Sequence, residues 1–172
     1  MKMSPSGAFA YFQRGKFDAI PPKILKDATN YGKNFMLALA KRLAPKQCKY
    51  INQSFSKDIL SGVDSLLKLL KKHKIHIENV EHEVSNDIWH GFIDLDCKEC
   101  FIEIKTRSNK KLELMTMVQC EVYKKITGKD YKIVYLVRKT GKCEFIEPKD
   151  ITKARRLIGC AETIYKELNG VK

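Results

Sequence analysis

The chain has 172 residues, of which 44% are hydrophobic and 31% are charged, a balance that is typical of a folded globular protein and excludes an intrinsically disordered chain. A chain of this length has room for one domain of ordinary size. Lysine and arginine outnumber aspartate and glutamate by 33 to 20, which leaves a formal charge of +13 at pH 7 and favours a polyanionic partner such as nucleic acid.

The apolar stretches of the chain are short. The longest, at residues 35–40 and 133–137, fall far below the roughly 20 residues that span a bilayer. The first residues lack the continuous apolar stretch of a secretory signal, so we expect an intracellular location, cytoplasmic or with the genome. The six cysteines are accordingly expected to be reduced thiols.

The N-terminal residues differ in pattern from the rest. Residues 1–22 carry Gly7, Gly15 and the pair Pro21-Pro22 before any periodic pattern begins, which predicts an irregular N-terminal arm. Residues 23–172 are expected to form a single domain.

Four segments are predicted to be helices. Helix formers dominate residues 23–44 and end before Pro45. A second helix over residues 57–73 has Ser56 as a candidate N-cap, a third ends before Gly128, and a fourth closes the chain. These three rest on apolar residues at helical spacing: Ile59, Val63, Leu66, Leu67 and Leu70; Leu112, Met115, Val118, Val122 and Ile126; and Ile151, Ala154, Ile158, Ala161, Tyr165 and Leu168.

Between the second and third helices the apolar period changes to two. This predicts strands at residues 75–84, 88–96 and 101–107, with a further strand at 131–138 and a candidate at 143–146. Three strands in a meander, a crossover helix and another strand imply an α/β fold in which helices flank a mixed β-sheet.

A hairpin between the second and third strands would bring two carboxylates together. If its turn is centred on Lys98-Glu99, positions whose numbers sum to 197 face one another, and Asp94 lies opposite Glu103. Like charges with β-carbons about 5 Å apart destabilise a sheet, so a neutralising cation is expected. Carboxylate oxygens suit Mg²⁺ or Mn²⁺, and a water on such an ion can become a nucleophile.

Other side chains of this hairpin are assigned by alternation. Lys105 shares the face of Glu103 and would hold a phosphate or an attacking water. Asp96 shares that face too but lies nearer the turn, where we expect it to be solvated. The opposite face is predicted to pack into the core: Ile93, Leu95, Ile102 and Ile104. The acidic face could alternatively be an exposed sheet surface screened by lysines.

These residues resemble the PD-(D/E)XK nuclease superfamily, in its RecB-like exonuclease branch. Gly91-Phe92-Ile93-Asp94 is similar to the G-x-x-D motif, Glu103-Ile104-Lys105 to E-x-K, and Gln119 with Tyr123 to Q-x-x-x-Y on the following helix. The resemblance implies a restriction-endonuclease-like core of αβββαβ order and a Mg²⁺- or Mn²⁺-dependent hydrolase that cuts DNA in replication, repair or recombination.

The resemblance also implies roles for individual residues. Asp94, Glu103 and the Ile104 backbone carbonyl would bind the metal, Lys105 would orient water, and Gln119 and Tyr123 would position the substrate strand or the water. The branch often has a His or Glu on an early helix as a further ligand, which residues 32–36 do not offer. Glu83 is the acidic candidate in its place, and a non-catalytic nucleic-acid-binding or assembly protein remains the alternative.

Several other residues have two interpretations. Cys97 and Cys100 could form half of a zinc site, but a second pair is missing. Trp89 and Tyr123 are candidates to stack on bases, Trp89 equally a core residue, and His90 could approach the substrate. Basic residues that could follow a phosphate backbone are Lys71, Lys72, Lys74, Lys110, Lys111, Lys124, Lys125, Arg155 and Arg156.

Overall fold

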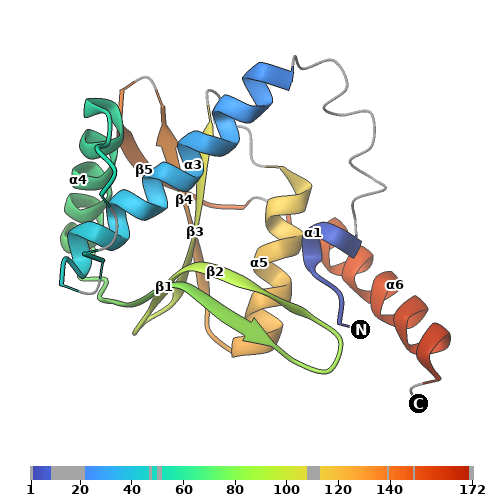
Figure 1. Ribbon diagram of the computed structural model, residues 1–172. Coiled ribbons are helices and arrows are strands. Elements are labelled where there is room, and N and C mark those ends of the chain that lie inside the picture. Colours follow the sequence, from blue (N-terminus) through green and yellow to red (C-terminus); the bar gives the residue numbers. More distant parts are fainter. Residues whose placement is uncertain are drawn as a thin grey trace.

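A computed structural model of the chain describes residues 2–8, 22–46, 48–49, 52–107, 113–138, 140–148 and 150–170. It contains one five-stranded sheet with helices on both of its faces (Figure 1). In chain order the elements are α1 (Pro5–Ala8), α3 (Pro22–Leu43), α4 (Lys57–Lys72), β1 (Ile77–Ser85), β2 (His90–Cys97), β3 (Phe101–Arg107), α5 (Leu114–Thr127), β4 (Tyr131–Val137), β5 (Lys142–Ile146) and α6 (Thr152–Asn169).

The predicted α/β class and the αβββαβ order are confirmed. Each expected helix and strand is present, and the candidate strand at residues 143–146 exists as β5. Boundaries differ from the predicted ones by at most a few residues, since helix and strand ends depend on local hydrogen bonds. Among the described residues, no helix combines the length and apolar character needed to cross a membrane.

The strands follow one another in the sheet in chain order, β1-β2-β3-β4-β5. The β3–β4 pair is parallel and the other pairs are antiparallel. A parallel pair requires a crossover connection, and α5 provides it. Figure 1 shows α3 and α4 on one side of the sheet and α5 and α6 on the other.

Each face of the sheet has its own hydrophobic core. On one face, buried side chains of α3 and α4 pack on the sheet. Phe35 of α3, Leu66 of α4 and Leu136 of β4 belong to this first core. Gly62 of α4 lies where a Cβ atom would come within 3.1 Å of Leu136 and 3.2 Å of Phe35, so the missing side chain allows the helix to approach the sheet. On the other face α5 and α6 cover a second cluster that includes Trp89.

The described part of the N-terminal arm is ordered against the second core. Met3 forms a parallel bridge with Trp89, with Met3 N–H donating to the Ile88 carbonyl and His90 N–H to the Met3 carbonyl, both at 2.8 Å. Residues 5–8 form a helical turn. The prediction of an irregular arm is therefore wrong for these residues, because Met3 and Ala8 find apolar partners in the second cluster. Residues 9–21 lie outside the described part of the chain.

Replacing Leu136 by Ala should lower the free energy of unfolding by about 2 to 5 kcal/mol, because it leaves a cavity in a core that cannot fully close. The matched change Leu168→Ala removes the same atoms from a side chain that is 80% exposed and should change stability by less than about 0.5 kcal/mol. Urea unfolding followed by circular dichroism measures both. Equal effects of the two changes would contradict this account of the core.

Candidate active site

The β2–β3 hairpin opens into a fork at the candidate carboxylates. Near the turn the predicted register is confirmed: Cys97 N–H donates to the Cys100 carbonyl at 3.0 Å, and Asp96 pairs with Phe101 and Leu95 with Ile102. The ladder ends there. Asp94 and Glu103, although next in this register, form no ladder pair, and neither do Phe92 and Lys105.

The β1–β2 ribbon provides the reason for the fork. β2 pairs with β1 at both of its ends and along most of its length, except at Asp94. β1 contains an irregularity between Ile77 and Asn79, and Glu81 has a left-handed conformation with φ of 52°. Two-stranded ribbons twist strongly, and bulges increase the twist. The ribbon therefore turns away from β3, and the space between the two strands admits a side chain.

Asp94 occupies this space. The Ile104 N–H donates to Asp94 Oδ2 at 2.6 Å, so a side-chain carboxylate replaces the missing backbone partner of β3. Part of the residue reaches the surface, but its carboxyl group is enclosed by protein. Burial raises the pKa of Asp94 to about 8, with a further contribution from Glu103, whereas Lys105 and the Ile104 N–H act in the opposite direction.

Glu103 lies beside Asp94 and is 1% exposed. Its Oε1 accepts a hydrogen bond from Lys105 Nζ at 2.5 Å, but its buried Oε2 has no hydrogen-bond partner among the described residues. Burial favours the neutral amine of Lys105, yet the charges of Glu103 and Asp94 outweigh burial and raise the pKa of Lys105. The fork thus holds two carboxyl groups and one ammonium group.

A chain of hydrogen bonds joins this group to α5. Lys105 Nζ donates to Gln119 Oε1 at 3.3 Å, and Gln119 Nε2 to the Tyr123 hydroxyl at 3.4 Å. The Tyr123 hydroxyl also accepts from Phe92 N–H at 3.2 Å, which ties it back to β2. The structure therefore brings Asp94, Glu103, Lys105, Gln119 and Tyr123 together.

Gly91 makes the approach of α5 to β2 possible. A Cβ atom at this position would lie 2.8 Å from Tyr123 Cε1, closer than real side-chain contacts come. The Tyr123 ring therefore occupies the space that any other residue in place of Gly91 would need. This contact links the glycine of the first motif to the tyrosine of the third.

Two predictions about the hairpin need correction. Asp96 is not solvated: it is 8% exposed and accepts from Lys129 Nζ at 2.6 Å. Ile93 does not share the core of Leu95 but lies in the cluster under α5 and α6, because the ribbon twists between these two positions.

Glu83, the candidate for an extra ligand, has a side chain that is 64% exposed and pairs with His90 at 3.0 Å. Its role as a metal ligand stays a prediction.

Two residues near the fork were not predicted from the sequence. The charge of Glu81 on β1 contributes to the raised pKa of Asp94, after burial and Glu103. The β1–β2 register, in which positions sum to 175 around this point, would have placed Glu81 beside Asp94. Cys120 is fully buried near Glu103 and Lys105, and burial raises the pKa of its thiol well above the usual value. No sequence pattern indicated it.

The donor set at the fork suits a hard cation. Among the described residues, no three His, Cys, Asp or Glu side chains converge to hold a metal, so a bound ion would rely on two carboxylates, backbone oxygen and water. The N–H and C=O groups of one strand residue point to the same side. Because the Ile104 N–H faces Asp94, the Ile104 carbonyl faces the fork as well.

Cys97 and Cys100, the candidate half of a zinc site, are free thiols and both are buried.

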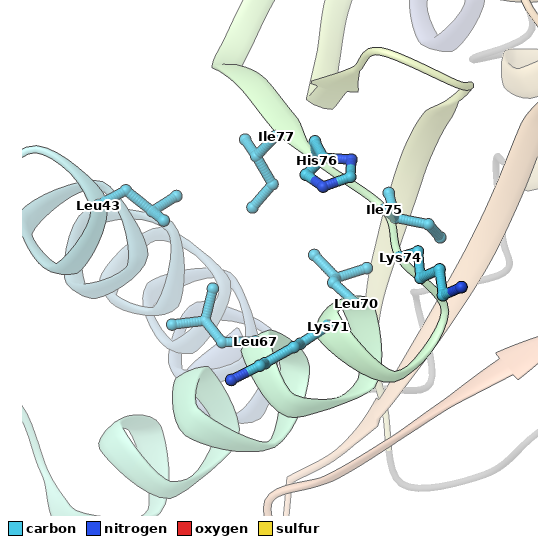
Figure 2. Close-up of a pocket in the computed structure, with 8 residues that line it drawn as sticks. All are labelled: Leu43, Leu67, Leu70, Lys71, Lys74, Ile75, His76 and Ile77. Carbon is cyan, nitrogen blue, oxygen red and sulfur yellow. The ribbon is translucent and has the colours of Figure 1, made fainter.

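Most of the basic residues predicted to contact phosphate lie elsewhere or are paired. Lys124, Lys125 and Arg155 form ion pairs with Asp130, Glu162 and Glu121 at 2.5, 2.5 and 2.7 Å. Lys71 and Lys74 line an apolar cleft of about 510 Å³ between α3, α4 and the start of β1 (Figure 2). None of the residues at the fork lines this cleft. Lys110 and Lys111 lie outside the described residues.

Solved structures resemble this chain only to a limited degree, as two of them show. No family model and no curated protein matches the sequence. The crystal structure of SSO0001 has 16% identity and a TM-score of 0.40, covering 96% of this chain and 76% of that one. The alkaline exonuclease LHK-Exo from Laribacter hongkongensis has 13% identity and a TM-score of 0.44, covering 98% and 91%. Likeness at this level assigns no activity.

The raised pKa of Asp94 predicts how the metal-free protein responds to pH. The unfolded chain releases this proton near pH 3.8 and the folded protein near pH 8, so the group destabilises the fold progressively as pH rises between these values. In EDTA, Asp94→Asn should therefore be more stable than the wild type at pH 8, by more than about 1 kcal/mol, and similar to it at pH 4.

Urea unfolding at the two pH values measures this difference. Asp87→Asn, at an exposed position, is the matched control and should show no pH-dependent gain. An Asp94→Asn protein that is less stable than the wild type at pH 8 would contradict the raised pKa of Asp94.

Proposed function

We propose that this chain is a metal-dependent nuclease that hydrolyses phosphodiester bonds in DNA. The observation that carries the proposal is Glu103 Oε2, a buried carboxylate oxygen that has no hydrogen-bond partner among the described residues, next to the buried carboxyl group of Asp94. A buried polar atom without a partner is costly, and the Lys105 ammonium group bonds to the other oxygen of Glu103. A cation in the fork would give Glu103 Oε2 a partner and would favour the charged form of Asp94.

Asp94, Glu103 and the Ile104 carbonyl would hold this ion. All three offer oxygen, which Mg²⁺ and Mn²⁺ prefer, and both ions keep several waters, in accord with a site that has two carboxylates. When bound, the ion supplies positive charge and lowers the pKa of its water. The unpartnered oxygen and the all-oxygen donor set thus support a fit to such an ion.

The remaining residues would handle the water and the phosphate. The Lys105 ammonium group, 2.5 Å from Glu103 Oε1, would orient the attacking water and stabilise the charge that develops on the phosphate. Its raised pKa keeps it protonated at neutral pH. Gln119 and Tyr123 would hold Lys105 and the β2 backbone in place through the hydrogen bonds described above, and so position the reacting groups.

The substrate class rests on charge. A formal charge of +13 favours association with a polyanion, and the fork offers a positive group for a phosphodiester. We assign DNA as the substrate, an exonuclease mode of attack, and a role in replication, repair or recombination inside the cell as parts of the same proposal.

One observation favours a second candidate function. Within the described residues no three His, Cys, Asp or Glu side chains form a group that could hold a metal ion, as would suit a nucleic-acid-binding or assembly protein that keeps the fold without cutting. Such a protein would bind DNA equally well with and without EDTA, and its affinity would fall steeply with salt.

Replacing Glu103 by Gln or Lys105 by Met should reduce cleavage of DNA by at least about a hundredfold, because each change removes a charge that acts on the reacting groups. The measurement is a time course with labelled linear single- and double-stranded DNA and Mn²⁺, with a closed circle to separate attack at ends from internal cuts. Glu167→Gln, on the exposed face of α6, is the control and should keep full activity. Full activity of Glu103→Gln would exclude this site.

Metal binding can be measured apart from catalysis. Isothermal titration with Mn²⁺ should give one site in the wild type and in Glu167→Gln, and strongly weakened binding in Glu103→Gln. Wild-type protein that binds DNA but shows neither Mn²⁺ binding nor cleavage would support the non-catalytic alternative instead.

A further inference from the structure

Phe92 is an exposed aromatic residue next to the fork. Its side chain lies on β2 two positions before Asp94 and is 50% exposed. A spacing of two strand residues corresponds to about 6.6 Å of backbone, so the ring begins within one nucleotide's reach of the candidate metal ligands. A single exposed apolar residue is ordinary on a protein surface. Phe92 differs from such a residue because its backbone and its ring are both held by neighbouring residues.

The frame around Phe92 fixes its position. Its N–H donates to the Tyr123 hydroxyl at 3.2 Å, and in the β1–β2 ladder it pairs with Glu83. The His90 ring meets the Phe92 ring edge-on, with centroids 5.5 Å apart and an interplanar angle of 85°. His90 is held in turn by Glu83 at 3.0 Å. The Phe92 ring is thus held on a paired strand, with its backbone bonded to Tyr123 and its edge in contact with His90, which Glu83 fixes in turn.

The aromatic residues that the sequence singled out do not offer an accessible ring. Trp89 is 0% exposed and donates from Nε1 to Glu162 at 2.8 Å, and Tyr123 is 3% exposed. Phe92 occupies a variable position of the G-x-x-D motif, to which the sequence pattern gave no role. Of these three rings, only that of Phe92 is exposed.

We propose that Phe92, with His90 at its edge, is a stacking platform for a nucleobase adjacent to the phosphate that is cut. This inference rests on the proposed nuclease function. Stacking on a protein ring requires a base whose face is free, whereas in a duplex each base is covered by its neighbours. The preferred substrate at this site is therefore single-stranded DNA or a frayed end, rather than an intact duplex.

The test is binding of two single-stranded probes in EDTA, where no cleavage occurs. Fluorescence anisotropy is measured with a labelled oligothymidylate and with an abasic oligomer of the same length. Phe92→Ala should weaken binding of oligothymidylate roughly 5- to 150-fold and leave abasic binding unchanged. Phe92→Trp should restore it and Phe92→Leu should not, since stacking needs a ring.

A control with a similar ring contact lies on β5, far from β2 in the sheet. Phe145 also meets a histidine edge-on, His73, with centroids 4.9 Å apart, although it is partly buried against the first core. Phe145→Ala should not separate the two probes. Equal losses for both probes in Phe92→Ala, or no loss for either, would overturn the proposal. Phe92→Leu keeps an apolar residue on the strand and provides the same comparison should Phe92→Ala fail to fold.

Hydrolysis of a small phosphodiester without bases separates this inference from the proposed function. With a short abasic phosphodiester, which has no ring that could stack on Phe92, and Mn²⁺, Phe92→Ala should keep the wild-type rate while its KM for oligothymidylate rises. An inactive wild-type protein that still distinguishes the two probes through Phe92 would remove the nuclease assignment but keep the stacking platform. A loss of rate on the small substrate would instead make Phe92 part of the catalytic machinery and overturn the platform role.

Discussion

The hydrogen bond from the Ile104 N–H to Asp94 Oδ2, at 2.6 Å, determines the local architecture. β2 must follow the twist of β1 and so cannot remain paired with β3 beyond Leu95 and Ile102. An unpaired strand backbone is costly when buried, and the Asp94 carboxylate satisfies it. The same bond fixes Asp94 beside Glu103 and turns the Ile104 carbonyl toward the fork, so a requirement of the sheet also assembles the oxygen atoms of the site.

A second constraint comes from α5. The crossover helix must pack on the sheet to connect parallel strands, and Gly91 allows Tyr123 to approach β2 closely. Tyr123 and Gln119 then extend a line of hydrogen bonds to Lys105. Residues that lie more than thirty positions apart in sequence therefore share one network. A substitution at Gly91 would displace Tyr123 and through it affect Lys105, which Gly91 does not contact.

The sequence predicted the features that depend on local pattern, namely the element order and the register near the turn. It failed for side chains whose surroundings depend on segments that are distant in the chain. Apolar periods gave the element order, and the turn at Lys98-Glu99 gave the register near Cys97 and Cys100. Simple alternation misplaced Ile93, because the twist of the ribbon reverses its face, and it left Asp96 solvated because Lys129, far along the chain, was not anticipated. Trp89 had two interpretations, base stacking and the core, and the core interpretation is confirmed, because the N-terminal bridge and α6 enclose this residue.

The central claim is that the fork between β2 and β3 holds a divalent cation. A crystal structure with Mn²⁺, located by its anomalous scattering, tests this most directly. We expect one peak in the fork with carboxylate oxygens of Asp94 and Glu103 and the Ile104 carbonyl in its coordination sphere, at the roughly 2.0–2.2 Å typical of such small divalent ions. An empty fork at saturating Mn²⁺, or a peak bound only by residues elsewhere, would contradict the account.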